Sequence, residues 1–141
     1  MKRVTILCAC LFLSGTALAS AGVNLRQTND GFTTFWLKFR MAVIRGDKKA
    51  VAALSKFPIG MSYGIRSIKG PAELGRRYRD LFNEQTDAAK CFAKKEPEKE
   101  EGKAARYSVA CPDAAGNEVV VYQFERTKTG WKFVGLDNIN E

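Results

Sequence analysis

The residues that could perform chemistry in this chain are a few carboxylates and cysteines, because the sequence contains no histidine. The absence of histidine excludes Ser-His-Asp and Cys-His nucleophiles, histidine-ligated zinc and a histidine general base. Glu125 and Asp137 lie near the ends of two predicted strands, where carboxylates commonly meet water. The acidic residues lack the paired spacing of a metal cluster. We therefore expect no metal, no cofactor and no assignable catalytic residue.

The first 19 residues have the pattern of a signal peptide. Lys2 and Arg3 form a short cationic start, residues 4–13 are apolar, and Ala17-Leu18-Ala19 offers the small-x-small cleavage pattern. No later segment approaches the roughly 20 apolar residues that a membrane-spanning helix needs. The sequence thus predicts a protein that is exported to the periplasm or secreted, with no transmembrane segment.

Two cysteines remain after such cleavage, since Cys8 and Cys10 belong to residues 1–19. Cys91 and Cys111 form an even pair in an oxidising compartment, which favours a disulfide over a metal site or a catalytic thiol. Closing a loop of about 20 residues is worth roughly 3 kcal/mol in the chain-entropy treatment. We expect this disulfide to be structural.

The chain is basic, with a formal net charge of +8 at pH 7, of which Lys2 and Arg3 belong to the predicted signal peptide. A basic exported protein can attract anionic lipid headgroups, cell-wall polymers or an acidic protein. Nucleic acid is not an expected partner in that compartment. The basic residues are interspersed with acidic ones, so a solvated surface that aids solubility is the simpler interpretation.

Residues 20–141 have the size of one domain, which we expect to begin with two helices. Asn29 or Asp30 can cap the first helix, whose apolar stripe consists of Phe32, Phe35, Trp36, Phe39 and Val43, widened by Leu37, Met41 and Ile44. Gly46 ends this helix. Asp47 caps a second, short helix, which stops before Phe57-Pro58.

A strand is predicted over residues 59–66, where apolar residues alternate with small or polar ones. The row of Gly60, Ser62 and Gly64 lets either a helix or a ligand approach the backbone closely, and we favour the helix. Pro71 begins a third helix through Phe82. Its three arginines suit an anion, but pairing with neighbouring carboxylates, including Asp80 with Arg76, is the preferred interpretation.

The remainder is predicted to be an antiparallel sheet. Short strands over residues 91–94 and 106–111 flank a charged, mobile loop over residues 95–103. Longer strands follow over residues 118–127 and 131–139, joined by a turn at residues 128–130.

Three stretches resemble small exported members of the NTF2-like (cystatin-like) superfamily: FWLKFRMAVIRGDKKAVAALSKFP, ELGRRYRDLF and VYQFERTKTGWKFVGLDN. The resemblance implies an α+β fold in which N-terminal helices pack in a curved antiparallel sheet to form a cone. It also implies a pocket that opens at one end, for which the candidate lining residues are Trp36, Phe39, Tyr63, Tyr78, Tyr122 and Trp131. Such aromatic residues more often form a core than a ligand site.

The fold hosts many activities, so function must be argued from the site. The leading hypothesis is a non-enzymatic exported domain that binds a small apolar ligand in the cone or a protein partner, with a homodimer through the sheet as a further option. The first alternative is an envelope inhibitor or immunity protein that blocks a toxin or a wall-cleaving enzyme. The second is an acid–base enzyme of the ketosteroid-isomerase type, whose catalytic pair we cannot assign in this sequence.

Overall fold

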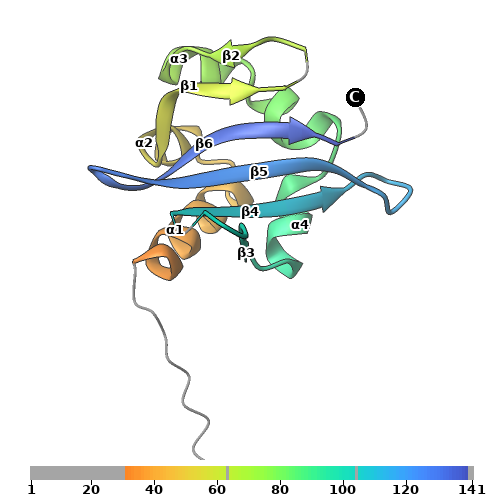
Figure 1. Ribbon diagram of the computed structural model, residues 1–141. Helices are drawn as coiled ribbons and strands as arrows, with labels where there is room; N and C mark the ends of the chain where they lie inside the picture. The colour runs from red at the N-terminus through yellow and green to blue at the C-terminus, as the bar shows by residue number, and fades with distance from the viewer. Residues whose placement is uncertain (1–30, 63, 104, 140–141) are drawn as a thin grey trace, which may run out of the picture.

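The computed structural model describes residues 31–62, 64–103 and 105–139. The predicted signal peptide, the predicted caps Asn29 and Asp30, and Tyr63 lie outside the described residues. Figure 1 shows the helices packed behind a curved sheet. The sheet has six strands in the order β2-β1-β6-β5-β4-β3. The expected α+β class is confirmed.

The elements follow one another as two helices, two strands, three helical segments and four strands. Their bounds are α1 Phe32–Ile44, α2 Lys48–Ala53, β1 Ser55–Met61, β2 Ser67–Ile68, α3 Pro71–Arg76, η1 Asp80–Glu84, α4 Ala88–Lys94, β3 Glu98–Lys99, β4 Arg106–Pro112, β5 Glu118–Thr127 and β6 Gly130–Asn138.

The two N-terminal helices form as the sequence predicts. The buried residues of α1 are Phe32, Phe35, Trp36, Phe39, Ala42 and Val43, which repeat at helical spacing. Gly46 follows this helix with φ of 63°, a conformation that glycine adopts without steric cost. The Asp47 side chain then accepts a hydrogen bond from the Ala50 backbone N–H at 3.0 Å. The predicted cap of α2 is confirmed.

The sheet is mixed, which corrects the expectation of a wholly antiparallel sheet. Strands β4, β5 and β6 are successive antiparallel neighbours, but β1 runs parallel to β6, with Gly60 opposite Gly135. Three helical segments separate the β1–β2 pair from β3, so the chain re-enters the sheet at its opposite edge. From that edge, strands β3 to β6 run back across the sheet in alternating directions, and the last of them, β6, lies parallel to β1.

The first strand is also displaced from its predicted position. It begins at Ser55, ends at Met61 and is followed by a turn in which Gly64 has φ of 65°, rather than continuing to residue 66. Gly60 lies against the next strand and not against a helix: a Cβ built on it would stand 3.8 Å from the Val134 carbonyl oxygen. That is an ordinary contact distance; the tighter position is the paired Gly135, where a Cβ would stand 3.2 Å from the Gly60 carbonyl oxygen.

Residues 91–94, predicted as a strand, belong to helix α4. Asp87 caps this helix by accepting from the Lys90 backbone N–H at 3.0 Å, and alanine and lysine, which favour helices, fill much of it. The Cys91–Cys111 disulfide is present, as predicted. It joins α4 to β4 and thereby holds a helix against the sheet, rather than clamping two strands.

The charged segment 95–103, predicted as a mobile loop, contains the short strand β3. Glu98 and Lys99 pair with Ser108 and Tyr107 of β4. Backbone pairing of this kind orders part of the segment, which places its charged side chains along the edge of the sheet.

The other face of the sheet is turned toward the viewer in Figure 1 and carries no helix among the described elements. Pairing of two copies through this face stays a prediction. Within the described residues, no helix has the length and apolar character needed to cross a membrane.

Candidate functional site

The predicted pocket aromatics lie inside the protein as one packed cluster. Five of the six are described, with exposed fractions of 2% for Trp36, 0% for Phe39, 8% for Tyr78, 0% for Tyr122 and 6% for Trp131. The rings contact one another and the core phenylalanines; Trp36, for instance, meets Phe92 edge-on at 5.1 Å between ring centroids. The cluster fills the space between the helices and the sheet.

The polar atoms of this cluster have partners in the fold. The Tyr122 hydroxyl donates to the Leu81 carbonyl oxygen at 2.8 Å, and the Tyr78 hydroxyl donates to the Val43 carbonyl oxygen at 3.3 Å. Burial, with a smaller contribution from the negative charge of Asp47, raises the pKa of Tyr78 above its ordinary value. The two hydrogen bonds tie helix α1 and the helical segment η1 to the core.

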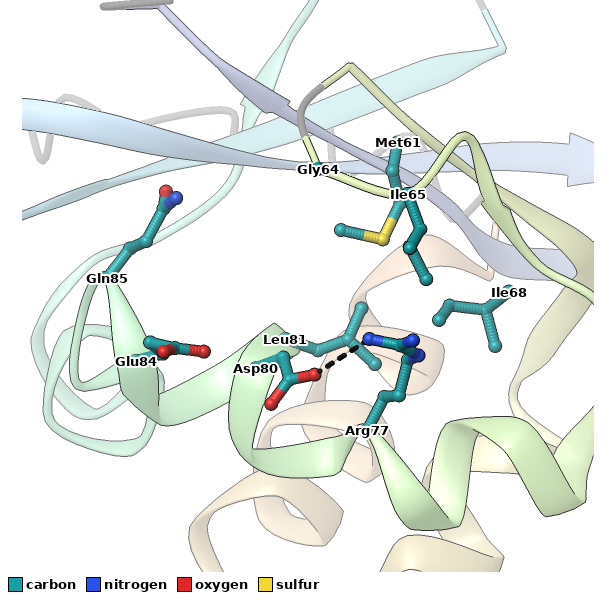
Figure 2. A pocket seen from close by; sticks show the side chains of 9 residues that line it. All are labelled: Met61, Gly64, Ile65, Ile68, Arg77, Asp80, Leu81, Glu84 and Gln85. Atoms are coloured by element: carbon teal, nitrogen blue, oxygen red, sulfur yellow. Dashed lines mark hydrogen bonds and ion pairs between the residues drawn. The ribbon is translucent and has the colours of Figure 1, made fainter.

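A cavity of about 260 Å³ lies beside the cluster, between the β1–β2 turn and the helical segment η1 (Figure 2). We call it the β1–β2 cavity. Its lining residues are Met61, Gly64, Ile65, Ile68, Arg77, Asp80, Leu81, Glu84 and Gln85.

The walls and floor of the β1–β2 cavity are apolar. Figure 2 shows the side chains of Met61, Ile65 and Ile68 on the strand side, with Leu81 facing them from η1. Ile68 and Leu81 are members of the hydrophobic core, with exposed fractions of 0% and 2%. The cavity therefore reaches from the surface to the core, as small-molecule sites commonly do.

One edge of the cavity is polar and bears more negative than positive charge. Arg77 Nη1 pairs with Asp80 Oδ2 at 3.2 Å, and Arg77 Nε lies 4.0 Å from Glu73 Oε1. Glu84 and Gln85 complete the edge. The charged lining residues are two carboxylates, Asp80 and Glu84, and one guanidinium, Arg77, so this edge is acidic although the whole chain is basic.

An interruption of the third helix creates this edge. The sequence predicts a continuous helix from Pro71 to Phe82, but α3 ends at Arg76 and the chain continues as the π-helical turn η1. Asp80 pairs with Arg77, one residue away from its predicted partner Arg76. The Tyr122 hydroxyl holds the Leu81 carbonyl and so fixes η1 over the sheet.

Sequence reasoning found the aromatic cluster but missed the cavity beside it. The described aromatic candidates are absent from the cavity lining, although Tyr122 holds its floor through Leu81. The predicted apolar alternation through Met61 and Ile65 was the available signal. The sequence predicts that Arg77 is surface charge paired with neighbouring carboxylates, and its ion pairs with Glu73 and Asp80 agree. Its place at the edge of a cavity depends on η1.

The two carboxylates considered for acid–base chemistry lie on the opposite face of the sheet. In β5, Tyr122 and Phe124 are buried on the helix side, whereas the alternate residues Val121 and Glu125 point the other way. Asp137 is directly paired with Val121 and shares its face. Glu125 forms an ion pair with Arg106 at 3.2 Å. Neither carboxylate reaches the aromatic cluster or the β1–β2 cavity.

Within the described residues, no three cysteine, aspartate or glutamate side chains lie together in a group that could hold a metal ion.

The helices held against one face of a curved six-stranded sheet form the cone that the resemblance implied. The fold is NTF2-like. Similar solved structures include a domain of unknown function with a cystatin-like fold from Nostoc punctiforme, 16% identical, covering 81% of this chain and 78% of that chain at a TM-score of 0.47. An NTF2-like protein from Novosphingobium aromaticivorans is 16% identical, with coverage of 76% and 77% and a TM-score of 0.43.

A ketosteroid isomerase-like protein from Erwinia carotovora atroseptica is 17% identical, covering 76% of this chain and 92% of that chain at a TM-score of 0.42. No protein-family profile matches the chain, and no curated protein matches it. The likeness concerns the fold, so the function is argued from the cavity itself.

Proposed function

We propose that this protein is an exported, non-enzymatic binding domain that takes a small apolar molecule in the β1–β2 cavity. The observation that carries the proposal is the apolar lining of the cavity, where the half-buried side chains of Met61 and Ile65 lie against a floor formed by the core residues Ile68 and Leu81. Burying an apolar ligand on such a floor removes apolar surface from water on both partners, at roughly 25 cal/mol per Å².

The aromatic cluster has a supporting role in this proposal. Trp36, Phe39, Tyr78, Tyr122 and Trp131 form a rigid base beside the ligand, and Tyr63 stays a predicted contact. A rigid base lowers the entropy lost on binding, because the site does not have to be ordered by the ligand.

The charges at the edge define the class of ligand. Asp80 and Glu84 outnumber Arg77, which is already paired with Asp80 at 3.2 Å. A ligand carboxylate or phosphate would meet net repulsion there, whereas an N–H or O–H donor could bond to the free carboxylate oxygens. We therefore assign the cavity to neutral or cationic apolar molecules that carry a hydrogen-bond donor.

Export is supported by two independent features. The first 19 residues have the signal-peptide pattern, and the Cys91–Cys111 disulfide suits an oxidising compartment. We include in the proposal that the protein is periplasmic or secreted. We also include that residues 20–141 form one domain. Binding is preferred over ketosteroid-isomerase-like turnover because Glu125 and Asp137 lie on the far face of the sheet.

The test uses N-phenyl-1-naphthylamine, a neutral apolar dye with one N–H donor, whose fluorescence rises in apolar sites. The purified protein lacking residues 1–19 should bind the dye saturably at one site. Ile65→Phe fills the cavity and should weaken binding about tenfold or more. Ile139→Phe is the matched control, because Ile139 is 57% exposed and does not line the cavity.

Equal loss of dye binding in both isoleucine variants, or no saturable binding by the parent, would refute the cavity as the site. Conversion of a bound molecule to product that persists after repurification would overturn the non-enzymatic part. Co-purification of a stoichiometric envelope enzyme, with dye binding unchanged by Ile65→Phe, would favour the inhibitor alternative.

A further inference from the structure

A second apolar surface lies on α1, on the side opposite the core. Leu37, Met41 and Ile44 have exposed fractions of 53%, 40% and 38% and recur at i, i+4 and i+7. Single exposed apolar residues are common, but three on one helical stripe form a continuous ridge. The ridge is separate from the β1–β2 cavity, since none of its residues lines that cavity.

The ridge borders a groove between α1 and α2. The groove has a volume of about 550 Å³; Met41 and Ala42 contribute from α1, and Ala50, Ala53 and Leu54 from α2 and its end. Alanines three residues apart on α2 leave the backbone close to the surface, so a partner helix can approach closely. We call this surface the α1–α2 groove.

The groove has a basic border. Lys38 and Arg45 line it, and Lys49 is exposed on α2 four residues before the lining Ala53, on the same side of that helix. Asp47 is its one acidic lining residue, and its side chain caps α2 by accepting from the Ala50 backbone N–H at 3.0 Å. The positive charge around the groove therefore lacks a matching set of carboxylates within its lining.

The charge and the shape of the α1–α2 groove together indicate which kind of partner binds there. Two copies meeting through this face would bring Lys38, Arg45 and Lys49 against the same residues, which is electrostatically unfavourable. A bilayer surface is broad and cannot follow a concave groove down to the buried Ala42, which is 5% exposed. A helix about 10 Å across can lie along the groove with apolar residues inside and carboxylates toward the basic border.

We propose that the α1–α2 groove binds an acidic amphipathic helix of a partner protein. Leu37 and Met41 contact the apolar face of that helix, and Lys38, Arg45 and Lys49 pair with its acidic flanks. The interaction is independent of ligand binding in the β1–β2 cavity, so each can fail without the other.

The test titrates the isotope-labelled protein lacking residues 1–19 with a synthetic peptide of about 16 residues. The peptide has leucines at i, i+3, i+4 and i+7 and glutamates elsewhere, and a scrambled peptide of the same composition is the control. NMR shifts should concentrate at Leu37, Met41, Ala50 and Ala53. The patterned peptide should bind about tenfold more tightly than the scrambled one.

Matched variants separate the groove from general charge. Met41→Glu and Lys38→Glu should each weaken peptide binding several-fold or more, because they place negative charge at the groove. Ile139→Glu and Lys94→Glu are the controls, at an exposed apolar site and an exposed lysine elsewhere. Both control variants should bind within about twofold of the parent, and preserved NMR spectra establish that each variant is folded.

Three outcomes would overturn the proposal. In the first, the scrambled peptide binds equally well or Met41→Glu binds like the parent. In the second, the protein sediments with phosphatidylglycerol-containing vesicles in a way that depends on Leu37 and Met41, while the peptide causes no NMR shifts. That result would make the surface a membrane contact. In the third, sedimentation shows a dimer that Met41→Glu abolishes, which would make it a self-association surface.

Discussion

The indole N–H of Trp36 donates a hydrogen bond to Glu96 Oε2 at 3.1 Å, across 60 positions of the chain. Glu96 also accepts from Arg40 Nη1 at 3.0 Å, so one carboxylate joins two positions on successive turns of α1. The Trp36 ring is buried among the core aromatics, whereas the Glu96 side chain is largely exposed. The charged segment after α4 is thereby held against the first helix.

Trp36→Ala should lower the free energy of unfolding by about 3 to 5 kcal/mol, because it removes a large core ring and leaves Glu96 without its indole donor. Chemical denaturation followed by circular dichroism measures the change. Lys38→Ala, two residues away on the exposed face, should change stability by no more than about 0.5 kcal/mol. A Trp36→Ala protein that unfolds like the parent would contradict the placement of α1.

Removing the disulfide should destabilise the protein without changing its fold. Cys91→Ala or Cys111→Ala should lower the free energy of unfolding by roughly 2 to 4 kcal/mol, since the loop between the cysteines regains freedom in the unfolded chain. Mass spectrometry of the oxidised parent should show two hydrogens fewer than the reduced form. Two thiols that alkylate freely in the native, unreduced protein would refute the bond.

Tyr78 should make the protein sensitive to alkaline pH. Its pKa in the folded protein is raised above the ordinary 10.0 by burial first and by Asp47 second. Above pH 10 the unfolded chain therefore releases this proton while the folded chain keeps it, so stability falls as pH rises toward the folded pKa. Below pH 10 the contribution is fully present.

Denaturation curves of the parent and Tyr78→Phe at neutral and alkaline pH measure this effect. The variant lacks the hydroxyl that bonds the Val43 carbonyl oxygen at 3.3 Å, so it should be less stable at neutral pH by about 1 kcal/mol. Its loss of stability above pH 10 should be shallower than that of the parent. Identical alkaline slopes would show that Tyr78 ionisation does not contribute.

The charge at the edge of the β1–β2 cavity should control which dyes bind. Glu84→Lys reverses the excess of carboxylates, so the anionic dye 8-anilino-1-naphthalenesulfonate should bind several-fold more tightly to the variant than to the parent. N-phenyl-1-naphthylamine, which is neutral, should bind both within about twofold. Glu101→Lys is the control, at an exposed position outside the cavity. An equal gain in both variants would mean that net charge alone is responsible.

Glu125→Gln and Asp137→Asn should leave N-phenyl-1-naphthylamine binding within about twofold of the parent. Both carboxylates face away from the helices, on the side of the sheet opposite the cavity. Fluorescence titration tests this directly. Turnover of any bound molecule that either substitution abolishes would instead support the enzyme alternative.

Much of the fold could be predicted from local pattern. The apolar repeat of α1, the Asp47 cap and the bounds of β5 follow from residues that are close together in the sequence. Helix α4 was misassigned as a strand, although Asp87 and the following alanines carried a helix signal. Residues 91–94 taken alone are too few for the 3.6-residue period of a helix to be told from the two-residue period of a strand.

The sequence by itself determined the absence of histidine chemistry, the pairing of Cys91 with Cys111 and the existence of an aromatic core. Residue types and short-range periodicity are sufficient for these conclusions. Only the tertiary structure decided that β1 runs parallel to β6 and that η1 breaks the third helix beside β2. Those features depend on contacts between distant segments, such as the Tyr122 hydroxyl on the Leu81 carbonyl, and they are what open a cavity beside an otherwise packed core.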